Sequence, residues 1–493
     1  MPDYEIRSVG TAHAGLLERF YESLYLPEFP HPDERESLEN MLGYLRKREA
    51  GWFGKNDYQI LLVLEGETPI AGVIGDYLEA PDTAVVEFLV VSSERRGRGL
   101  GRKLLVAFEE AMKASARRAG RSLFAVVAEM NDPYRWTPHA DSLDPFTRAA
   151  IWHSWGFGRV DFPYVQAALS AGQRPVTTLM LIAKLFGSES YSGAGKTIGS
   201  GSERTIDPRT VKLIVHEYMR WAMRIDEPAG NAEFVAMARF LDRKAAGGQA
   251  IGVEPLGEYL ADAESVPFAV REARRGDFEL LRQIAEVYER CFPPSPTALQ
   301  PGAFGEALES GRHEGKSYRY HLWGLADRET GRMAGLASYY SFRRMGFGGY
   351  LCLERSLAGR GLLKRLVGCV ERQMVHDGLE PQGWLIECDP QGTDTIAKFE
   401  SVGFCRLAVT YHQPPLFDAP SSAQPGPLLT LLYKGLGAGF GEKPRLEVDV
   451  FIEAMAEIIR FGYRVGDPWK SRELQSLVLQ TRQAPGGLVE WAS

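Results

Sequence analysis

The chain has 493 residues, of which 44% are hydrophobic and 25% charged, and this composition indicates a globular protein of two or more domains rather than a disordered one. The formal net charge of −7 argues against a nucleic-acid binder, and no apolar run is long enough to span a membrane. Residues 1–10 lack the basic and apolar regions of a signal peptide. The five cysteines are widely spaced and the nine histidines form no ligand cluster with them, so we expect reduced thiols, no metal and a cytoplasmic location.

The first part of the chain has the pattern of interspersed strands and helices. β-branched and apolar residues dominate the expected strands, whereas apolar residues recur every three to four positions in the expected helices. The predicted strands span 58–64, 70–77, 85–91, 122–130 and 175–185, and the predicted helices span 102–119 and 146–155. This order predicts a mixed α/β (α+β) fold.

The second half of the chain repeats this pattern. Residues 97–100 recur at 359–362, and residues 156–157 recur at 403–404, in the same order and at nearly the same spacing. Preserved order and spacing indicate a tandem duplication. The predicted segments are a first domain at 1–187, a Gly/Ser linker and helical connector at 188–266, a second domain at 267–437 and a helical tail at 438–493.

The connector carries apolar residues at helical spacing over 208–244. An apolar helix face has to be buried against another surface. We therefore expect these helices to pack between the two copies.

A glycine-rich turn follows the apolar strand 85–91 and opens a long helix. Glycines at 97, 99 and 101 let backbone N–H groups converge beside the positive end of the helix, and the neighbouring arginines add charge. This arrangement suits a pyrophosphate, although a solvated basic turn is an open alternative. A dinucleotide-binding loop does not fit, because Arg102 replaces its third glycine. The P-loop-like segment 193–197 lacks the required first glycine, since Ser190 stands there.

The loop Arg96-Gly-Arg-Gly-Leu-Gly101 after an apolar strand, followed downstream by Trp152-His-Ser-Trp-Gly156-Phe157, resembles the GNAT acetyltransferase superfamily. The resemblance covers residues 4–186 closely and 268–435 more loosely. It implies two tandem GNAT-like domains, each a mixed, mostly antiparallel sheet flanked by helices. It further implies an N-acetyltransferase that uses acetyl-CoA as co-substrate, without a metal, and acts on an amine of a small molecule or peptide.

The resemblance also implies how acetyl-CoA is held. The loop would bind the pyrophosphate, and the end of the preceding strand would pair with the pantetheine arm. A backbone N–H would polarise the thioester carbonyl while the amine attacks directly in a ternary complex. The expected cofactor-binding residues are Leu89, Val90, Val91, Arg96, Gly97, Arg98, Gly99, Leu100, Gly101 and Arg102.

Glu87 is the predicted general base. It lies in an apolar strand at the same parity as Leu89 and Val91, where an apolar setting raises the pKa of a carboxyl group. An ion pair with a nearby arginine and a solvated strand face are the alternatives. Glu129, at the end of the next strand, is a second candidate, and the other copy has its counterpart in Glu387.

The acid that protonates the departing thiolate is less well defined. Many GNAT members place a tyrosine there, whereas this chain has Trp152, which cannot supply a proton at neutral pH. Tyr164 and Tyr134 are the candidates. For Tyr164, a half-buried aromatic at a strand end is the alternative.

The second copy has lost the residues of the expected site. Ala358, Leu363 and Gly349 stand where the first copy has Arg96, Gly101 and Glu87, so we expect a scaffold there rather than a second catalyst. Two other functions stay open: an aminoacyl-tRNA-dependent Fem-type transferase, which the five cations of residues 95–103 would suit, and a non-catalytic acyl-CoA-sensing or assembly module. The oligomeric state is open.

Overall fold

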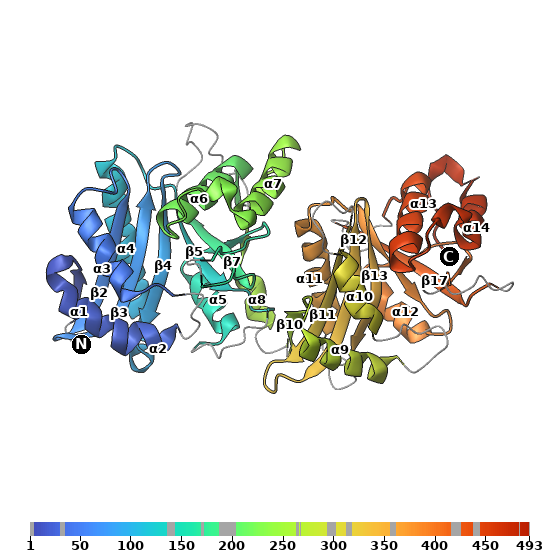
Figure 1. Ribbon diagram of the computed structural model, residues 1–493, viewed down its shortest axis with the longest axis horizontal. Coiled ribbons are helices and arrows are strands. Elements are labelled where there is room, and N and C mark those ends of the chain that lie inside the picture. The colour runs from blue at the N-terminus through green and yellow to red at the C-terminus, as the bar shows by residue number, and fades with distance from the viewer. Residues whose placement is uncertain are drawn as a thin grey trace. The chain divides into compact units, whose positions relative to one another are not determined.

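The computed structural model describes residues 4–29, 35–135, 143–168, 172–186, 204–262, 266, 268–292, 302–311, 318–354, 361–415, 425–436, 444–482 and 484–492. Contacts divide the chain into two compact units, Met1–Glu264 and Ser265–Ser493. Unit 1 runs from blue to green in Figure 1 and unit 2 from yellow to red. Within the described part of the chain, no helix is both long and apolar enough to cross a membrane.

Unit 1 is built on a nine-stranded sheet. Its strands, in spatial order, are β1 (Tyr4–Ser8), β2 (Asp57–Glu65), β3 (Thr68–Leu78), β4 (Thr83–Val91), β5 (Ala125–Asn131), β7 (Leu179–Leu185), β6 (Gly158–Val160), β9 (Ile251–Pro255) and β8 (Arg204–Ile206). The pairing is antiparallel except between β4 and β5, which are parallel. The predicted strands and helices of the first copy are confirmed, with ends shifted by a few residues.

Helices cover both faces of this sheet (Figure 1). On one face, Phe108 of α4 (Leu100–Arg118) lies over Gly75 of β3, where a Cβ would be 2.7 Å from its ring. On the other face, Phe20 of α1 (Ala14–Phe20) lies over Gly72 in the same way. The two glycines let α4 and α1 approach β3 closely. The shorter helices α2 (Leu26–Glu28), α3 (Leu38–Glu49), α5 (Pro145–Ser154) and α8 (Gly257–Asp262) complete unit 1 with the pair described next.

The segment that the sequence suggested as a connector is part of unit 1. Its helices α6 (Pro208–Trp221) and α7 (Ala232–Ala246) bury their apolar faces in one cluster with Phe124, Leu181 and other residues of the sheet. Strands β8 and β9, which precede and follow the two helices in the chain, extend the sheet through β6. The apolar stripe of α6 is thus buried without the second copy, because the sheet of unit 1 offers it an apolar surface.

Unit 2 repeats this architecture on an eight-stranded sheet. Its strands are β10 (Phe268–Glu272), β11 (Tyr318–Asp327), β12 (Met333–Phe342), β13 (Met345–Leu353), β14 (Gly383–Cys388), β17 (Leu428–Gly435) and β15 (Cys405–Arg406), with β16 (Tyr411–His412) paired to β17. Its helices include α9 (Phe278–Cys291), α10 (Gly302–Gly311), α11 (Leu362–His376) and α12 (Thr393–Glu400). The parallel pair is β13 and β14, as β4 and β5 are in unit 1. The expected two-domain fold class is confirmed.

The repeat extends beyond the segments that sequence matching found. The tail helices α13 (Val448–Glu457) and α14 (Arg472–Thr481) correspond to α6 and α7. Arg224 after α6 and Arg464 after α13, 240 residues apart, both have a positive φ, of 55° and 58°. Asn231 and Ser471 cap α7 and α14 with side-chain oxygens. The connector helices and the tail helices are therefore equivalent elements, one pair in each copy.

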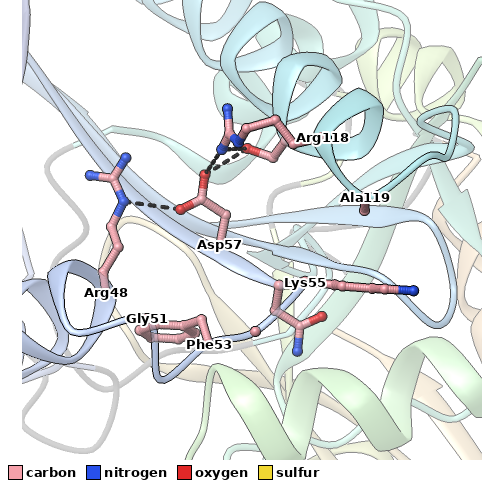
Figure 2. Close-up of a pocket in the computed structure, with 10 residues that line it drawn as sticks. Arg48, Gly51, Phe53, Lys55, Asp57, Arg118 and Ala119 are labelled. Carbon is pink, nitrogen blue, oxygen red and sulfur yellow. Dashed lines mark hydrogen bonds and ion pairs between the residues drawn. The ribbon is translucent and has the colours of Figure 1, made fainter.

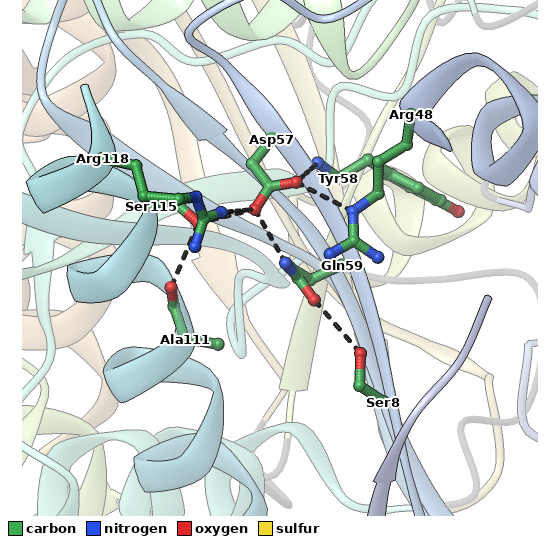
Figure 3. Close-up of polar contacts among 8 residues, drawn as sticks. All are labelled: Ser8, Arg48, Asp57, Tyr58, Gln59, Ala111, Ser115 and Arg118. Atoms are coloured by element: carbon green, nitrogen blue, oxygen red, sulfur yellow. Dashed lines mark hydrogen bonds and ion pairs between the residues drawn. The ribbon is translucent and has the colours of Figure 1, made fainter. Parts of the chain in front are cut away.

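A buried polar network joins β2 to α4 in unit 1 (Figure 3). The carboxylate of Asp57 accepts hydrogen bonds from Arg48 Nε (3.0 Å), Arg118 Nη2 (2.6 Å) and Ser115 Oγ (2.6 Å). It also accepts from the Gln59 side chain at 2.7 Å and from its neighbour's backbone N–H. These donors satisfy a carboxylate that would otherwise be costly to bury.

Unit 2 has a different network at the same place, centred on the buried His321. His321 pairs with Tyr339 across β11 and β12, as Gln59 pairs with Gly75 across β2 and β3. His321 therefore occupies the position of Gln59. Its Nδ1 lies 2.7 Å from Glu272 Oε1 and its Nε2 3.0 Å from Asp377 Oδ2. Burial alone would lower the pKa of His321, but the carboxylates of Asp377 and Glu272 outweigh it and raise this pKa to about 9.

This network predicts that unit 2 loses stability at alkaline pH. Because the pKa of His321 is raised from about 6.5 to about 9 on folding, its contribution is complete below pH 6.5 and is lost as the pH rises through 9. This contribution amounts to about 3 kcal/mol. Thermal unfolding of the full chain between pH 6 and 9.5 should show this loss, and His321→Gln should flatten it. His153→Gln, at an exposed histidine, is the control, and an unchanged pH dependence in His321→Gln would contradict the assignment.

Candidate active site

The parallel strands β4 and β5 separate halfway along their length. Their pairing runs from Thr83 with Ala125 to Val86 with Ala128. Glu87 and Glu129 are the next residues of the two strands, so they stand on opposite sides of the opening. Beyond this point β4 pairs, within the described part of the chain, with β3 alone, and its other edge can offer backbone groups to a ligand.

Glu87 occupies an irregular position in β4. Ile74 pairs with Phe88 and Gly75 with Val86, so Glu87 is the extra residue of a β-bulge. A bulge changes the direction of a side chain and marks many active sites. The predicted pantetheine contacts lie just beyond: Leu89 and Val91 are half-buried, and Val90 is buried in the core of α1 and α3.

The glycine-rich loop has the backbone of an anion cradle. Gly97 and Gly99 both have φ of 75°, a region in which residues with a Cβ are strained. Gly99 caps α4 without a side-chain hydrogen bond, so the first N–H groups of the helix are available to a bound anion. Gly101 lies against Trp155, since a Cβ there would be 3.1 Å from the indole ring. Leu100 is buried and anchors the turn, while Arg98 and Arg102 are exposed beside it.

Arg96 does more than provide charge. Its Nη2 lies 2.5 Å from Glu28 Oε2 of α2, and its Nε donates to the carbonyl of Val91 at 3.1 Å. The guanidinium therefore ties the loop to the end of β4 and to α2. Arg95 is likewise paired, at 2.6 Å from Glu65 Oε2.

Glu87 belongs to a buried cluster of three charged groups, together with Asp76 of β3 and Arg224. Asp76 is fully buried, and its Oδ2 lies 4.0 Å from Arg224 Nη2. The Arg224 guanidinium packs over the ring of Tyr44 at 4.0 Å. The carboxylate oxygens of Asp76 and Oε1 of Glu87 are buried without a hydrogen-bond partner among the described residues.

This cluster shifts the titration of Glu87 upward. Burial and the adjacent Asp76 carboxyl raise the pKa of Glu87 well above its usual value, and Arg224 partly opposes them. Burial also raises the pKa of Asp76, again against the attraction of Arg224. The raised pKa that the sequence predicts for Glu87 is present, and so is the neighbouring arginine of the alternative interpretation.

Glu129 and Tyr164 are brought together on the other side of the opening. The Tyr164 hydroxyl donates to one oxygen of Glu129, and Gln166 Nε2 donates to the other at 3.0 Å. Burial and the Glu129 carboxylate raise the pKa of Tyr164 well above its usual value. Tyr218 of α6 lies close enough to Glu129 and Glu87 that both raise its pKa, after burial.

Unit 2 keeps a carboxyl group at the position of Glu129 but has none at the position of Glu87. Tyr463 donates to Glu387, which also lies beside Tyr411, and burial raises the pKa of Glu387 to about 7. Gly349 stands at the bulge position of Glu87, and Tyr340 at the register position of Asp76. Gly361 keeps the positive φ, of 70°, at the start of α11. Ala358 lies outside the described residues.

The remaining aromatic candidates are packed in the core. Trp152 of α5 contacts the rings of Trp155 and Phe157. Tyr134 packs against Phe146 and Tyr259. Neither contact set places the residue at the opening between β4 and β5.

A separate cavity of about 390 Å³ lies between the start of β2 and the end of α4 (Figure 2). Arg48, Lys55 and Arg118 line it. Asp57 pairs with both arginines, and Lys55 Nζ is 3.6 Å from Glu79. Each of these three cations already has a carboxylate partner. We therefore assign the cavity to the surroundings of the Asp57 network.

The geometry agrees with what comparison with known proteins finds. Residues 18–134 match the model of the acetyltransferase (GNAT) family. The solved structures similar to this chain include the ribosomal-protein-S18-alanine N-acetyltransferase of Escherichia coli, at 14% identity over 39% of this chain and 99% of the other, with a TM-score of 0.26. A tandem GNAT protein of the clavulanic acid pathway has 14% identity over 89% of this chain and 100% of the other, with a TM-score of 0.26. An acetyltransferase of Salmonella typhimurium, solved with acetyl-CoA, has 19% identity over 39% of this chain and 99% of the other, again with a TM-score of 0.26. No protein of curated function matches.

Residues 18–134 of unit 1 thus match the GNAT family, and unit 2 repeats the topology of unit 1. Three residues of the site escaped sequence reasoning: Asp76, Tyr218 and Arg224. The aspartate within the apolar strand 70–77 could have indicated Asp76, and the repeat of an arginine at 464 could have indicated Arg224.

Proposed function

We propose that unit 1 transfers the acetyl group of acetyl-CoA to an amine of a small molecule or peptide, by direct attack in a ternary complex. The observation that carries the proposal is the juxtaposition at the opening of the sheet. There the free edge of β4 leads from Glu87 to the uncapped start of α4. The cradle at 97–102 fits the pyrophosphate, because its backbone is already in the conformation that exposes N–H groups.

Each group of the site then has a role. Acetyl-CoA supplies the thioester. The loop 96–102 holds its pyrophosphate, and the edge of β4 at 89–91 orients the pantetheine arm. Glu87 takes the proton that the amine loses as the new C–N bond forms and the C–S bond breaks. Tyr164 is the candidate donor of the proton that the departing sulfur takes up. Burial and its hydrogen bond to Glu129 make Tyr164 a weaker acid than an exposed tyrosine.

The Fem-type alternative is less well supported. Of the five cations in 95–103, Arg95 and Arg96 are paired with Glu65 and Glu28, which reduces the charge available to a nucleic-acid phosphate. A test uses the full chain with acetyl-CoA and a panel of amines, and measures release of free CoA thiol. Amine-dependent release supports the proposal. Binding of acetyl-CoA without release would favour a sensing module, and activity only with aminoacyl-tRNA would favour the Fem-type reaction.

The loop assignment predicts the effect of a bulky residue at Gly99. In Gly99→Val a β-branched side chain would have to adopt φ of 75°, which costs about 1–2 kcal/mol. The loop should therefore rearrange and the affinity for acetyl-CoA should fall about tenfold or more. Isothermal titration calorimetry of the full chain measures this. Gly361→Val makes the same change at the start of α11 and should leave the affinity of unit 1 unchanged, and equal losses in both variants would contradict the placement.

A further inference from the structure

Arg224 lies outside the segment that matches the GNAT family, yet its charge acts on the proposed base. It follows the end of α6 and has φ of 55°, a conformation that is uncommon for any residue except glycine. Such a conformation persists only where surrounding contacts maintain it. The contacts here are the rings of Tyr44 and Phe53, whose centroids lie 4.0 and 5.3 Å from the guanidinium.

The charges of the cluster do not balance one to one. Arg224 has a side chain only 16% exposed, and its single positive charge faces the two carboxyl groups of Asp76 and Glu87. Two adjacent carboxyl groups in an apolar setting do not both ionise readily, so one keeps a proton to higher pH. The ion pair of Arg224, at 4.0 Å, is with Asp76. Arg224 therefore favours Asp76 as the group that carries the charge.

We propose that Arg224 is a positioning residue of the acetyl transfer, which holds Asp76 ionised and keeps Glu87 within reach of ionisation, so that Glu87 takes the proton of the acceptor amine. This inference rests on the proposed function, because it concerns the base of that reaction. It deepens that function by making the helical pair α6 and α7 part of the catalytic unit. Without the cation, both carboxyl groups would hold their protons to higher pH and the base would be unavailable near neutrality.

Other groups around Glu87 contribute less or in the other direction. Those that face the cluster are Glu36 before α3, Tyr25 after α1, Tyr44 of α3, Tyr58 of β2 and Tyr218 of α6. Glu36 raises the pKa of Glu87 further. Burial raises the pKa of all four tyrosines, that of Tyr44 to about 12, so they stay neutral. Arg224 is the cation that opposes these effects on Glu87.

Unit 2 provides a natural comparison. Arg464 has the same backbone conformation, but its Nη1 lies 2.5 Å from Glu306 Oε2 and its Nη2 donates to the carbonyl of Ala303 at 3.3 Å. Tyr340 and Gly349 replace the two carboxyl residues. The arginine is thus retained in both units, whereas its carboxyl pair is present only in unit 1.

The test compares pH profiles of kcat/KM for Arg224→Met, Arg224→Lys and Asp76→Asn in the full chain. The acid limb of the profile, where activity is lost on lowering the pH, should move to higher pH by about one unit or more in Arg224→Met. Arg224→Lys should keep most of the wild-type profile. Asp76→Asn removes the negative neighbour of Glu87 and should move the limb to lower pH. Arg464→Met is the matched control and should change nothing.

Opposite shifts from two neighbouring substitutions cannot come from general damage to the fold. An unmoved acid limb in both Arg224→Met and Asp76→Asn would overturn the inference. A higher KM for the acceptor with an unmoved limb would instead assign Arg224 to substrate binding, and would overturn it too. Glu87→Gln, measured in parallel, distinguishes failure of this inference from failure of the proposed function. Full activity in that variant would show that Glu87 is not the base and would contradict the proposed mechanism, whatever the result for Arg224.

Discussion

Glu87→Gln should lower kcat by about 10²–10⁴-fold, the usual effect of removing general-base catalysis. The affinity for acetyl-CoA should stay within about twofold, because Glu87 lies before the residues expected to contact the cofactor. Turnover by free-thiol release and affinity by calorimetry measure the two quantities on the same preparation. Wild-type kcat in the variant between pH 6 and 9 would contradict the assignment and leave Glu87 as a partner in a structural ion pair.

The same substitution should leave the protein stable. Burial and Asp76 raise the pKa of Glu87 well above its usual value, so folding favours the protonated form of this group. A glutamine has the same shape and is neutral, and it therefore replaces the protonated acid without an unpaired charge. Thermal unfolding of Glu87→Gln should match the wild type, which separates loss of the base from loss of the fold.

Two controls set the scale of this effect. Glu387→Gln removes the buried carboxyl of unit 2 and should leave turnover unchanged, since unit 2 has Gly349 at the position of the base. Tyr164→Phe should reduce turnover less than Glu87→Gln, because the hydroxyl of Tyr164 is already engaged with Glu129.

Local patterns predict much of this site because its parts are contiguous in the chain. The apolar strand, the glycine turn and the amphipathic helix follow one another from Val85 to Arg118, so their periodicity and turn chemistry suffice to place the cradle. Glu87 is found in the same way, as a lone acid in an apolar strand. The point at which β4 and β5 separate is a tertiary feature, however, and the sequence alone does not show that Glu87 and Glu129 face the same opening.

Arg224 illustrates what such patterns miss. Its ring contacts and its ion pair join residues from α3, β3 and the end of α6, and no local spacing connects them. Helical periodicity correctly predicts α6, but it does not say which surface the helix covers. The match between 208–244 and 448–481 would have shown that the helices belong to the repeated unit, yet few identical residues remain in it, among them Arg224 and Arg464, Pro228 and Pro468.

A fragment of residues 1–187 should be insoluble or inactive, whereas a fragment of residues 1–264 should be soluble and keep the acetyl transfer. The shorter fragment lacks α6, α7 and the strands β8 and β9. The apolar side chains of the two helices that unit 1 buries include Val211, Ile214, Val215, Tyr218, Met219, Phe234, Met237 and Leu241. At about 1.5–3 kcal/mol for each large apolar side chain buried, these side chains together contribute about 12–24 kcal/mol, which is comparable to or larger than the 5–15 kcal/mol by which most domains are stable.

The comparison of the two fragments also tests the catalytic role of the helical pair. A 1–187 fragment that folds would still lack Tyr218 and Arg224, and its activity should then be low with the acid limb at higher pH, as in Arg224→Met. A soluble and fully active 1–187 fragment would show that the pair is dispensable. We expect Gly361→Val in the full chain to leave turnover intact. An inactive but folded 1–264 fragment would show instead that unit 2 contributes to the reaction, and in that case Gly361→Val should reduce turnover.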